Sequence, residues 1–179
     1  MHIKAGKTIF EILEANFSTI KADCLIFPTN NYLWMGNEIT TNIKKLAGGK
    51  VEQEALQQAP ANTGTAIVTS GGSLPFEFLI HAVCMEQDCK INDLNLKQSV
   101  LSSLNIMVEK KCTKAVLIPF FLANSGLSIF KTAEIIIDNC IDFCLSDKNI
   151  EKISIVDSDP QTITVFTNYM ANKFSIKKK

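Results

Sequence analysis

DCLIFPTNNYLWMGNEITTNIKKLAGG, residues 23–49, is the stretch of sequence that decides the fold. It opens with an apolar run at residues 24–27, which is typical of a buried strand. We expect Pro28 to end this strand, because proline donates no hydrogen bond to a sheet. Ile39, Ile43 and Leu46 then recur at helical spacing, and the glycines at 48 and 49 predict the end of that helix.

The loop between this strand and this helix is the first candidate ligand site. It holds a polar turn at residues 29–31, an apolar lip at 32–35, and Gly36. Open α/β sheets commonly bind ligands where a strand is followed by a helix. The helix N-terminus offers free N–H groups and a partial positive charge, which suit an anion. This pattern alone is not specific for a ligand site, since most strand–loop–helix units bind nothing.

Length and charge limit the classes of function. The 179 residues fit a single domain spanning 1–179. Lysine plus arginine and aspartate plus glutamate both number 18, so the net charge is zero. This balance argues against electrostatic attraction of the whole protein to nucleic acid or to a membrane. The basic tail at residues 175–179 is expected to be frayed.

The six cysteines and two histidines do not form a metal-binding pattern. Cys24, Cys84 and Cys140 lie in apolar segments, where a free cysteine behaves as a small hydrophobic residue. We therefore expect reduced cysteines, a cytoplasmic location, no metal and no cofactor. No apolar run reaches the length of about 20 residues that a membrane helix needs, and no secretory signal opens the sequence.

The remaining segments alternate between strands and helices. Strands are expected at residues 2–14 (with a helical turn possible at 10–15), 65–69, 78–84, 115–118 and 152–156. Helices are expected at 50–58, 93–110, 131–145 and from Pro160 onward, after a capping Ser158-Asp159 pair. This alternation predicts an α/β fold with helices on both faces of a largely parallel sheet.

Four pieces of the chain together resemble a macro domain. Residues 23–43 are similar to the family's central strand, asparagine turn and glycine-rich loop. Residues 64–69 resemble its second motif, 79–83 the following strand, and 115–119 the strand before its second ligand loop. The resemblance implies a three-layer α/β/α fold with a mixed, largely parallel central sheet. It also implies binding of ADP-ribose; some members of the family remove ADP-ribose from proteins, or deacetylate its acetyl ester.

The resemblance places the ligand-binding residues on two loops. Asn30 matches the asparagine that orients the distal ribose, although an asparagine here can also satisfy its own turn. The second loop aligns without gaps to residues 122–124, and a small shift would place it at 124–126 instead; in either case an Asn or Gly can adopt the left-handed turn that it needs. The ligand-binding candidates are Thr29, Asn30, Asn31, Met35, Gly36, Asn37, Ile39, Asn124, Ser125, Gly126 and Leu127.

Several positions depart from the family pattern. The aspartate that receives the adenine amino group is matched to Lys7, and the adenine-stacking aromatic residue to Val156. Only Gly36 remains of the glycine run. Glu38 follows it, where a carboxylate either repels a diphosphate or points to solvent as a first-turn acid. We therefore expect altered adenine recognition and binding of ADP-ribose weaker than micromolar.

Aromatic residues border both loops. Tyr32 and Trp34 either form a wall for a base or ribose, or pack beside the sheet. Phe120 and Phe121 stand where the family has small residues, and we expect them to reshape the cleft, the alternative being core packing. His81 ends a buried run and is expected to be structural.

Three functions remain open. The first is a module that binds ADP-ribose or a related nucleotide, free or attached to a protein, with no nucleic-acid or membrane partner. The second is an ADP-ribosyl hydrolase or deacetylase. Thr40, Ala82 and Ser128 occupy the family's catalytic positions without matching them, which leaves Asn30 as the one catalytic candidate. The third is a degenerate scaffold that serves a protein partner.

Overall fold

The computed structural model describes residues 1–120, 122, 124–146 and 149–175. Within these residues, the strands are β1 (His2–Ala5), β2 (Thr8–Glu14), β3 (Cys24–Asn30), β4 (Thr65–Ser70), β5 (Phe78–Met85), β6 (Lys114–Leu117) and β7 (Lys152–Asp157). The α-helices are α1 (Glu38–Ala47), α2 (Gly49–Leu56), α3 (Asp93–Glu109), α4 (Ile129–Leu145) and α5 (Pro160–Ser175), and a 3₁₀ helix, η1, spans Phe17–Thr19.

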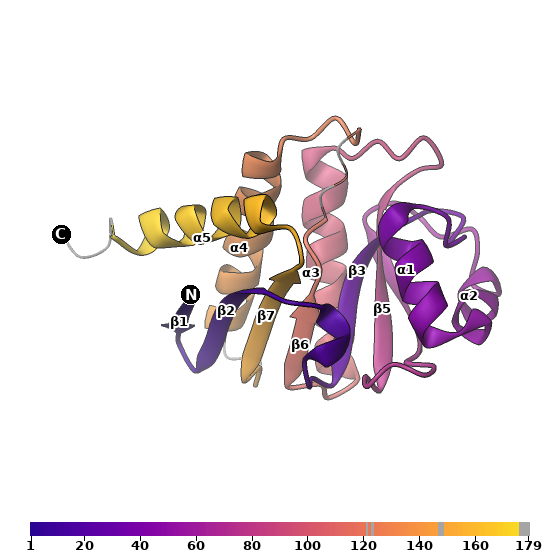
Figure 1. Ribbon diagram of the computed structural model, residues 1–179, viewed down its shortest axis with the longest axis horizontal. Helices are drawn as coiled ribbons and strands as arrows, with labels where there is room; N and C mark the ends of the chain where they lie inside the picture. The colour runs from indigo at the N-terminus through magenta and orange to yellow at the C-terminus, as the bar shows by residue number, and fades with distance from the viewer. Residues whose placement is uncertain (121, 123, 147–148, 176–179) are drawn as a thin grey trace.

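The strands form one mixed sheet in the order β1-β2-β7-β6-β3-β5-β4 (Figure 1). The inner strands β2, β7, β6, β3 and β5 are parallel to one another. The outer strands β1 and β4 are antiparallel to β2 and β5. The predicted mixed, largely parallel sheet is confirmed.

Helices cover both faces of the sheet and make three layers. Helices α3, α4 and α5 lie together on one face, and α1 and α2 lie toward the other end of the sheet on the opposite face (Figure 1). Alternate residues of β3 feed the two cores: Cys24 and Ile26 pack under α3–α5, whereas Leu25 and Phe27 pack under α1 and α2. This alternation follows from the pleat of a strand that is buried on both faces.

Pro28 does not end β3, contrary to the expectation from sequence. The strand continues to Asn30, and Pro28 pairs with Ala82 of β5. In a parallel strand alternate residues bond to opposite neighbours, and Ile26 accepts a hydrogen bond from Ile118 on the β6 side. The backbone of Pro28 therefore faces β6. Pairing between β3 and β6 ends at Ile26, so the missing N–H of the proline removes no hydrogen bond from the sheet.

Other boundaries differ in detail. Residues 10–14 are strand rather than a helical turn, and the turn of helix follows later, at η1. Helix α4 begins before Lys131, because the Ser128 side chain caps it by accepting from the Lys131 N–H. Helix α2 ends at Leu56 rather than at 58. The predicted cap of α5 is confirmed, with Asp159 accepting from Gln161 and Thr162.

The core contains the predicted central residues, and Leu25, Ile26, Ile80, Val116 and Ile118 are all buried. All six cysteines are free, and five of them are buried. No helix in the described part of the chain is long and apolar enough to cross a membrane. The expectations for the tail at 176–179 and for Phe121 concern positions outside the described residues.

Candidate ligand cleft

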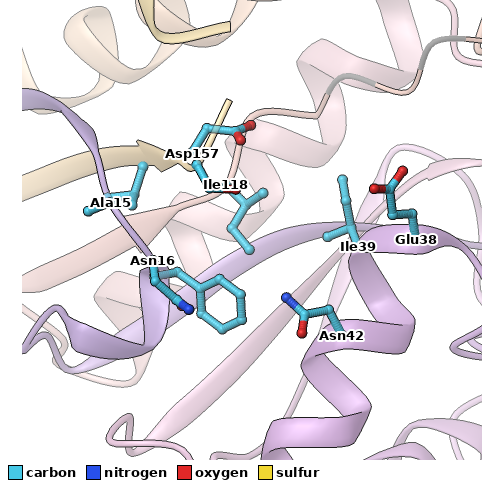
Figure 2. Close-up of a pocket in the computed structure, with 10 residues that line it drawn as sticks. Ala15, Asn16, Glu38, Ile39, Asn42, Ile118 and Asp157 are labelled. Atoms are coloured by element: carbon cyan, nitrogen blue, oxygen red, sulfur yellow. The ribbon is translucent and has the colours of Figure 1, made fainter. Parts of the chain in front are cut away.

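A cavity of about 280 Å³ opens at the carboxyl ends of the parallel strands (Figure 2). Four segments surround it: the turn from β2 into η1, the first turns of α1, the end of β6, and the end of β7. Its lining residues are Ala15, Asn16, Phe17, Glu38, Ile39, Asn42, Ile118, Val156, Asp157 and Ser158. This is the edge of an open α/β sheet at which ligands commonly bind.

The floor of the cavity is apolar and its rim is polar. Phe17, Ile118 and Val156 belong to the core under α1 and supply the floor, with Ile39 packed against them. The amides of Asn16 and Asn42 extend from opposite sides at one end of the cavity (Figure 2). An apolar floor with a few polar groups at the rim suits a small organic ligand.

Two carboxylates stand at the other end of the cavity, Glu38 at the start of α1 and Asp157 at the end of β7 (Figure 2). Burial raises the pKa of the Asp157 carboxyl above its ordinary value, and the charges of Asp159 and Glu38 add to that shift. Hydrogen bonds from the Asp159 and Ser158 backbone oppose it. Glu38 is exposed to solvent although it lines the cavity, so it fits neither a fully inward nor a fully outward orientation.

The structure corrects the match of the family's adenine-binding aspartate to Lys7. Lys7 lies in the turn before β2, and the next residues of β2 pair with the beginning of β7. Lys7 is therefore at the opposite end of the sheet from the cavity. The residue that enters the cavity from the end of β2 is Asn16, whose Oδ1 accepts from the N–H and the hydroxyl of Ser18.

The side chain of Asn30 holds its own loop together. Its Oδ1 accepts from the Tyr32 N–H and its Nδ2 donates to the Trp34 carbonyl, both at 2.9 Å. The loop is anchored further by Leu33, which is buried with φ of 62°, and by the Met35 N–H, which donates to Glu52 at 2.7 Å. Asn30 is thus engaged within the loop, as the structural alternative for this residue predicts.

The same region contains buried polar atoms without partners. Among the described residues, the buried side-chain atoms with no hydrogen-bond partner are Thr29 Oγ1, Asn31 Oδ1, Asn37 Nδ2, His81 Nδ1 and Ser125 Oγ. All except His81 belong to the two loops proposed from sequence to bind the ligand. Buried polar atoms are normally paired with protein, water or a ligand, so these loops have unused hydrogen-bonding capacity.

The second loop is fixed by backbone hydrogen bonds on either side of Ser125. The Ser125 N–H donates to Leu122 and its carbonyl accepts from Ile91, both at 2.9 Å. The Lys90 ammonium donates to the Asn124 carbonyl at 2.8 Å. Gly126 adopts the left-handed turn with φ of 86°, and Leu127 is partly buried against the main core.

The aromatic residues of the loops behave differently from one another. Tyr32 and Trp34 are 47% and 40% exposed, which agrees with partial burial as a lip beside the sheet, and neither of them lines the cavity. Phe120 is fully buried in the core under α3 and α4 and does not line the cavity, so the expectation that it reshapes the cleft is wrong.

His81 is structural, as its place in a buried run predicts. Its ring lies 4.5 Å from that of Phe27, and its Nε2 lies 2.9 Å from the Thr69 hydroxyl. Complete burial lowers the pKa of His81 to about 3. Thr40, at a family catalytic position, is also buried and bonds to Asn37 through both its N–H and its hydroxyl.

Of the eleven ligand-binding candidates from sequence, only Ile39 lines this cavity. The rest lie on the two loops beyond it. Sequence reasoning missed Asn16, Phe17 and Asn42, although the position of Asn16 at the end of a strand was a usable signal. Within the described residues no group of three or more His, Cys, Asp or Glu side chains could hold a metal ion.

Comparison with known proteins gives consistent results. The model of the macro domain family matches residues 26–137. An uncharacterized protein of Aquifex aeolicus is 27% identical over 154 residues, which cover 86% of this chain and 92% of that protein. Human protein mono-ADP-ribosyltransferase PARP14 is 29% identical over 166 residues, which cover 92% of this chain but only 9% of that much longer protein.

Solved structures show the same fold. The Oceanobacillus iheyensis macrodomain with ADP superposes with a TM-score of 0.85 and 19% identity, covering 100% of this chain and 97% of that one. The Trypanosoma brucei macrodomain in complex with ADP-ribose gives a TM-score of 0.82 and 12% identity, covering 90% of this chain and 68% of that one. At these identities the likeness concerns the fold alone.

Proposed function

The chain belongs to the macro domain family, and we propose that its cleft binds ADP-ribose or a related nucleotide, free or attached to a protein. One observation carries the proposal. Among the described residues, all the unpartnered buried polar atoms except that of His81 lie on the two loops, which meet the cavity of about 280 Å³ at Glu38 and Ile118. Solved macrodomains with the same fold contain ADP or ADP-ribose, which supports this class of ligand.

In this proposal the adenosine part of the nucleotide occupies the cavity. Phe17, Ile118 and Val156 offer apolar surface to a base, and the amide of Asn16 can hydrogen-bond to its edge. The Asn16 Oδ1 already accepts two hydrogen bonds from Ser18, so the group that Asn16 offers to a base is its Nδ2 donor, and an amino group finds no carboxylate acceptor at this position. This substitution is the basis for proposing altered, weaker adenine recognition.

The diphosphate end then lies between the two loops. Asn37 caps α1 through its Oδ1 and leaves its Nδ2 free to donate, while Gly126 brings the backbone of the second loop close without a side chain. Ser125 adds a hydroxyl that has no partner within the described residues. Donors at a helix N-terminus favour anions.

A cytoplasmic location is consistent with six free cysteines.

Calorimetric titration with ADP-ribose tests the proposal. Asn42→Trp should block the cavity mouth and lower the affinity at least tenfold, because Asn42 is exposed at the rim. Leu46→Trp is the matched control, since Leu46 is exposed on the same helix but does not line the cavity. Thermal melts would verify that both variants fold. Absence of heat with the wild-type protein at millimolar ADP-ribose would contradict the proposal.

A further inference from the structure

The cavity carries acidic groups that a site for an anionic nucleotide does not need. Glu38 and Asp157 both line it, and no lysine or arginine occurs among the described residues of the lining. The two carboxylates come from different elements and lie on opposite sides of one end of the cavity (Figure 2). The charge of Glu38 is also among the causes that raise the pKa of the Asp157 carboxyl.

Asp157 is positioned by the fold rather than by a flexible side chain. It is the last residue of β7, and its Oδ1 accepts a hydrogen bond of 2.9 Å from the Asp159 N–H. Its partial burial places the carboxylate at the cavity wall instead of in open solvent. The carboxylate therefore retains acceptor capacity, because two oxygens can accept more bonds than are used.

A carboxylate at a strand end recognises a ribose with free hydroxyls. Each hydroxyl donates to a carboxylate oxygen, and the same carboxylate repels a phosphate attached to that ribose. We propose that Glu38 and Asp157 make this cleft select nucleosides whose ribose 2′ and 3′ hydroxyls are free and reject those that carry a phosphate there. This inference rests on the proposed function and adds the chemical class of nucleotide that the cleft accepts.

Isomers of adenosine monophosphate provide a test at constant ligand charge. Adenosine 5′-monophosphate carries its phosphate toward the donor-rich loops, whereas the 2′ and 3′ isomers place it near the carboxylates. The 5′ isomer should bind at least tenfold more tightly than either of the others in calorimetric competition. The double variant Glu38→Gln, Asp157→Asn should bring the ratio of affinities close to one.

Glu14→Gln supplies the matched control. Glu14 is exposed and lies opposite Asp157 in the register of β2 and β7, but it does not line the cavity. Removing its charge should leave the preference for the 5′ isomer unchanged. If Glu14→Gln abolishes the preference as fully as the double variant does, general surface charge is responsible and the inference is wrong.

Protonation of the carboxylates gives a second way to test the preference for the 5′ isomer. The charged groups that face Asp157 are Glu38 on α1, Asp159 in the turn before α5, and Glu14 on β2. Lowering the pH until Asp157 takes up a proton should reduce the discrimination in the wild-type protein but not in the double variant. Both isomers carry a phosphate monoester, so its own titration largely cancels in the ratio.

The possible outcomes distinguish failure of the proposed selectivity from failure of the proposed binding function. If ADP-ribose binds but the isomers bind equally well, the selectivity is disproved while the proposed function stands. If neither ADP-ribose nor any isomer binds at millimolar concentration, both are disproved. Preference for the 5′ isomer that survives in the double variant would assign the selectivity to other residues and overturn the roles of Glu38 and Asp157.

Discussion

The indole of Trp34 lies directly against Gly36, so that a Cβ added at Gly36 would overlap the six-membered ring. Gly36 has no positive φ, and the requirement for glycine therefore comes from this contact rather than from backbone strain. Because Trp34 is the only tryptophan of the chain, its emission reports on this loop alone.

Gly36→Ala should displace the indole toward solvent and shift its fluorescence emission to longer wavelength. The ring is the end of a movable, 40% exposed side chain, so the free energy of unfolding should change by less than about 1 kcal/mol. Gly49→Ala is the control, because nothing lies within 4 Å of a Cβ at that position. An unchanged emission spectrum in Gly36→Ala would show that the ring does not rest on Gly36.

Asn30→Ala should lower the free energy of unfolding by about 1–3 kcal/mol, because it removes two hydrogen bonds from a buried loop. Urea denaturation measures this change. If Asn30 also contacts the ligand, affinity for ADP-ribose should fall in protein that is still fully folded. Destabilisation together with unchanged affinity would confine Asn30 to a structural role.

His81 should make the protein less stable in mild acid. Its folded-state pKa, about 3, lies below the unfolded value near 6.5, so below pH 6.5 the unfolded state binds the proton first. The stability contribution is full above pH 6.5 and is lost as the pH falls toward 3, by an amount on the order of a few kcal/mol. Thermal melts of wild type and His81→Gln between pH 7 and 4 measure this slope, which should be shallower in the variant.

Asp157→Asn should raise the melting temperature at pH 7, because the folded protein holds a carboxylate whose charged form is disfavoured by burial. For an acid with a raised folded-state pKa, stability is highest at pH values below the unfolded pKa and falls as the pH rises through the folded pKa. The gain from the variant should therefore disappear in strong acid. A lower melting temperature at pH 7 would mean that the Asp159 hydrogen bond outweighs the burial.

Asp23→Ala should destabilise the protein by roughly 2–3 kcal/mol. The Asp23 carboxylate accepts from the Thr113 and Lys114 N–H groups at 2.7 and 2.9 Å and so joins the starts of β3 and β6. Denaturant titration gives the magnitude. Asp88→Ala, which removes a local bond to the Lys90 N–H in an exposed turn, should cost distinctly less.

The fold could be predicted from sequence because its signals are local and repeated. The apolar runs around Ile26, Ile80 and Val116 can only be buried strands, and caps such as Asp159 mark where helices begin. The end of β3 cannot be predicted from Pro28, because the effect of the proline depends on which neighbouring strand its missing N–H would have faced. That information lies in the pairing of distant strands and not in the residue itself.

The candidate site was harder to predict for the same reason. Lys7 and Asn16 stand at opposite ends of β2, and only the direction of β2 relative to β7 shows which of them enters the cavity. From sequence alone, Phe120 could point either toward the cleft or toward the core. In the structure it is buried in the core that also contains residues of α3 and α4. The unpartnered atoms of Thr29 and Ser125 have no sequence signature at all.

The early end of β6 gives the sheet a notch. Strand β6 pairs with β3 only as far as Leu117, whereas β3 continues along β5 to Asn30 and β7 continues along β2 to Asp157. Beyond Leu117 the sheet is split into two separate pairs of strands, and Ile118 lies in the gap as the floor of the cavity. Ile118, whose N–H donates to the Ile26 carbonyl, is therefore the last residue of this segment that bonds to β3 among the described residues, and the opening left between β3 and β7 is what gives a ligand access to the middle of the sheet.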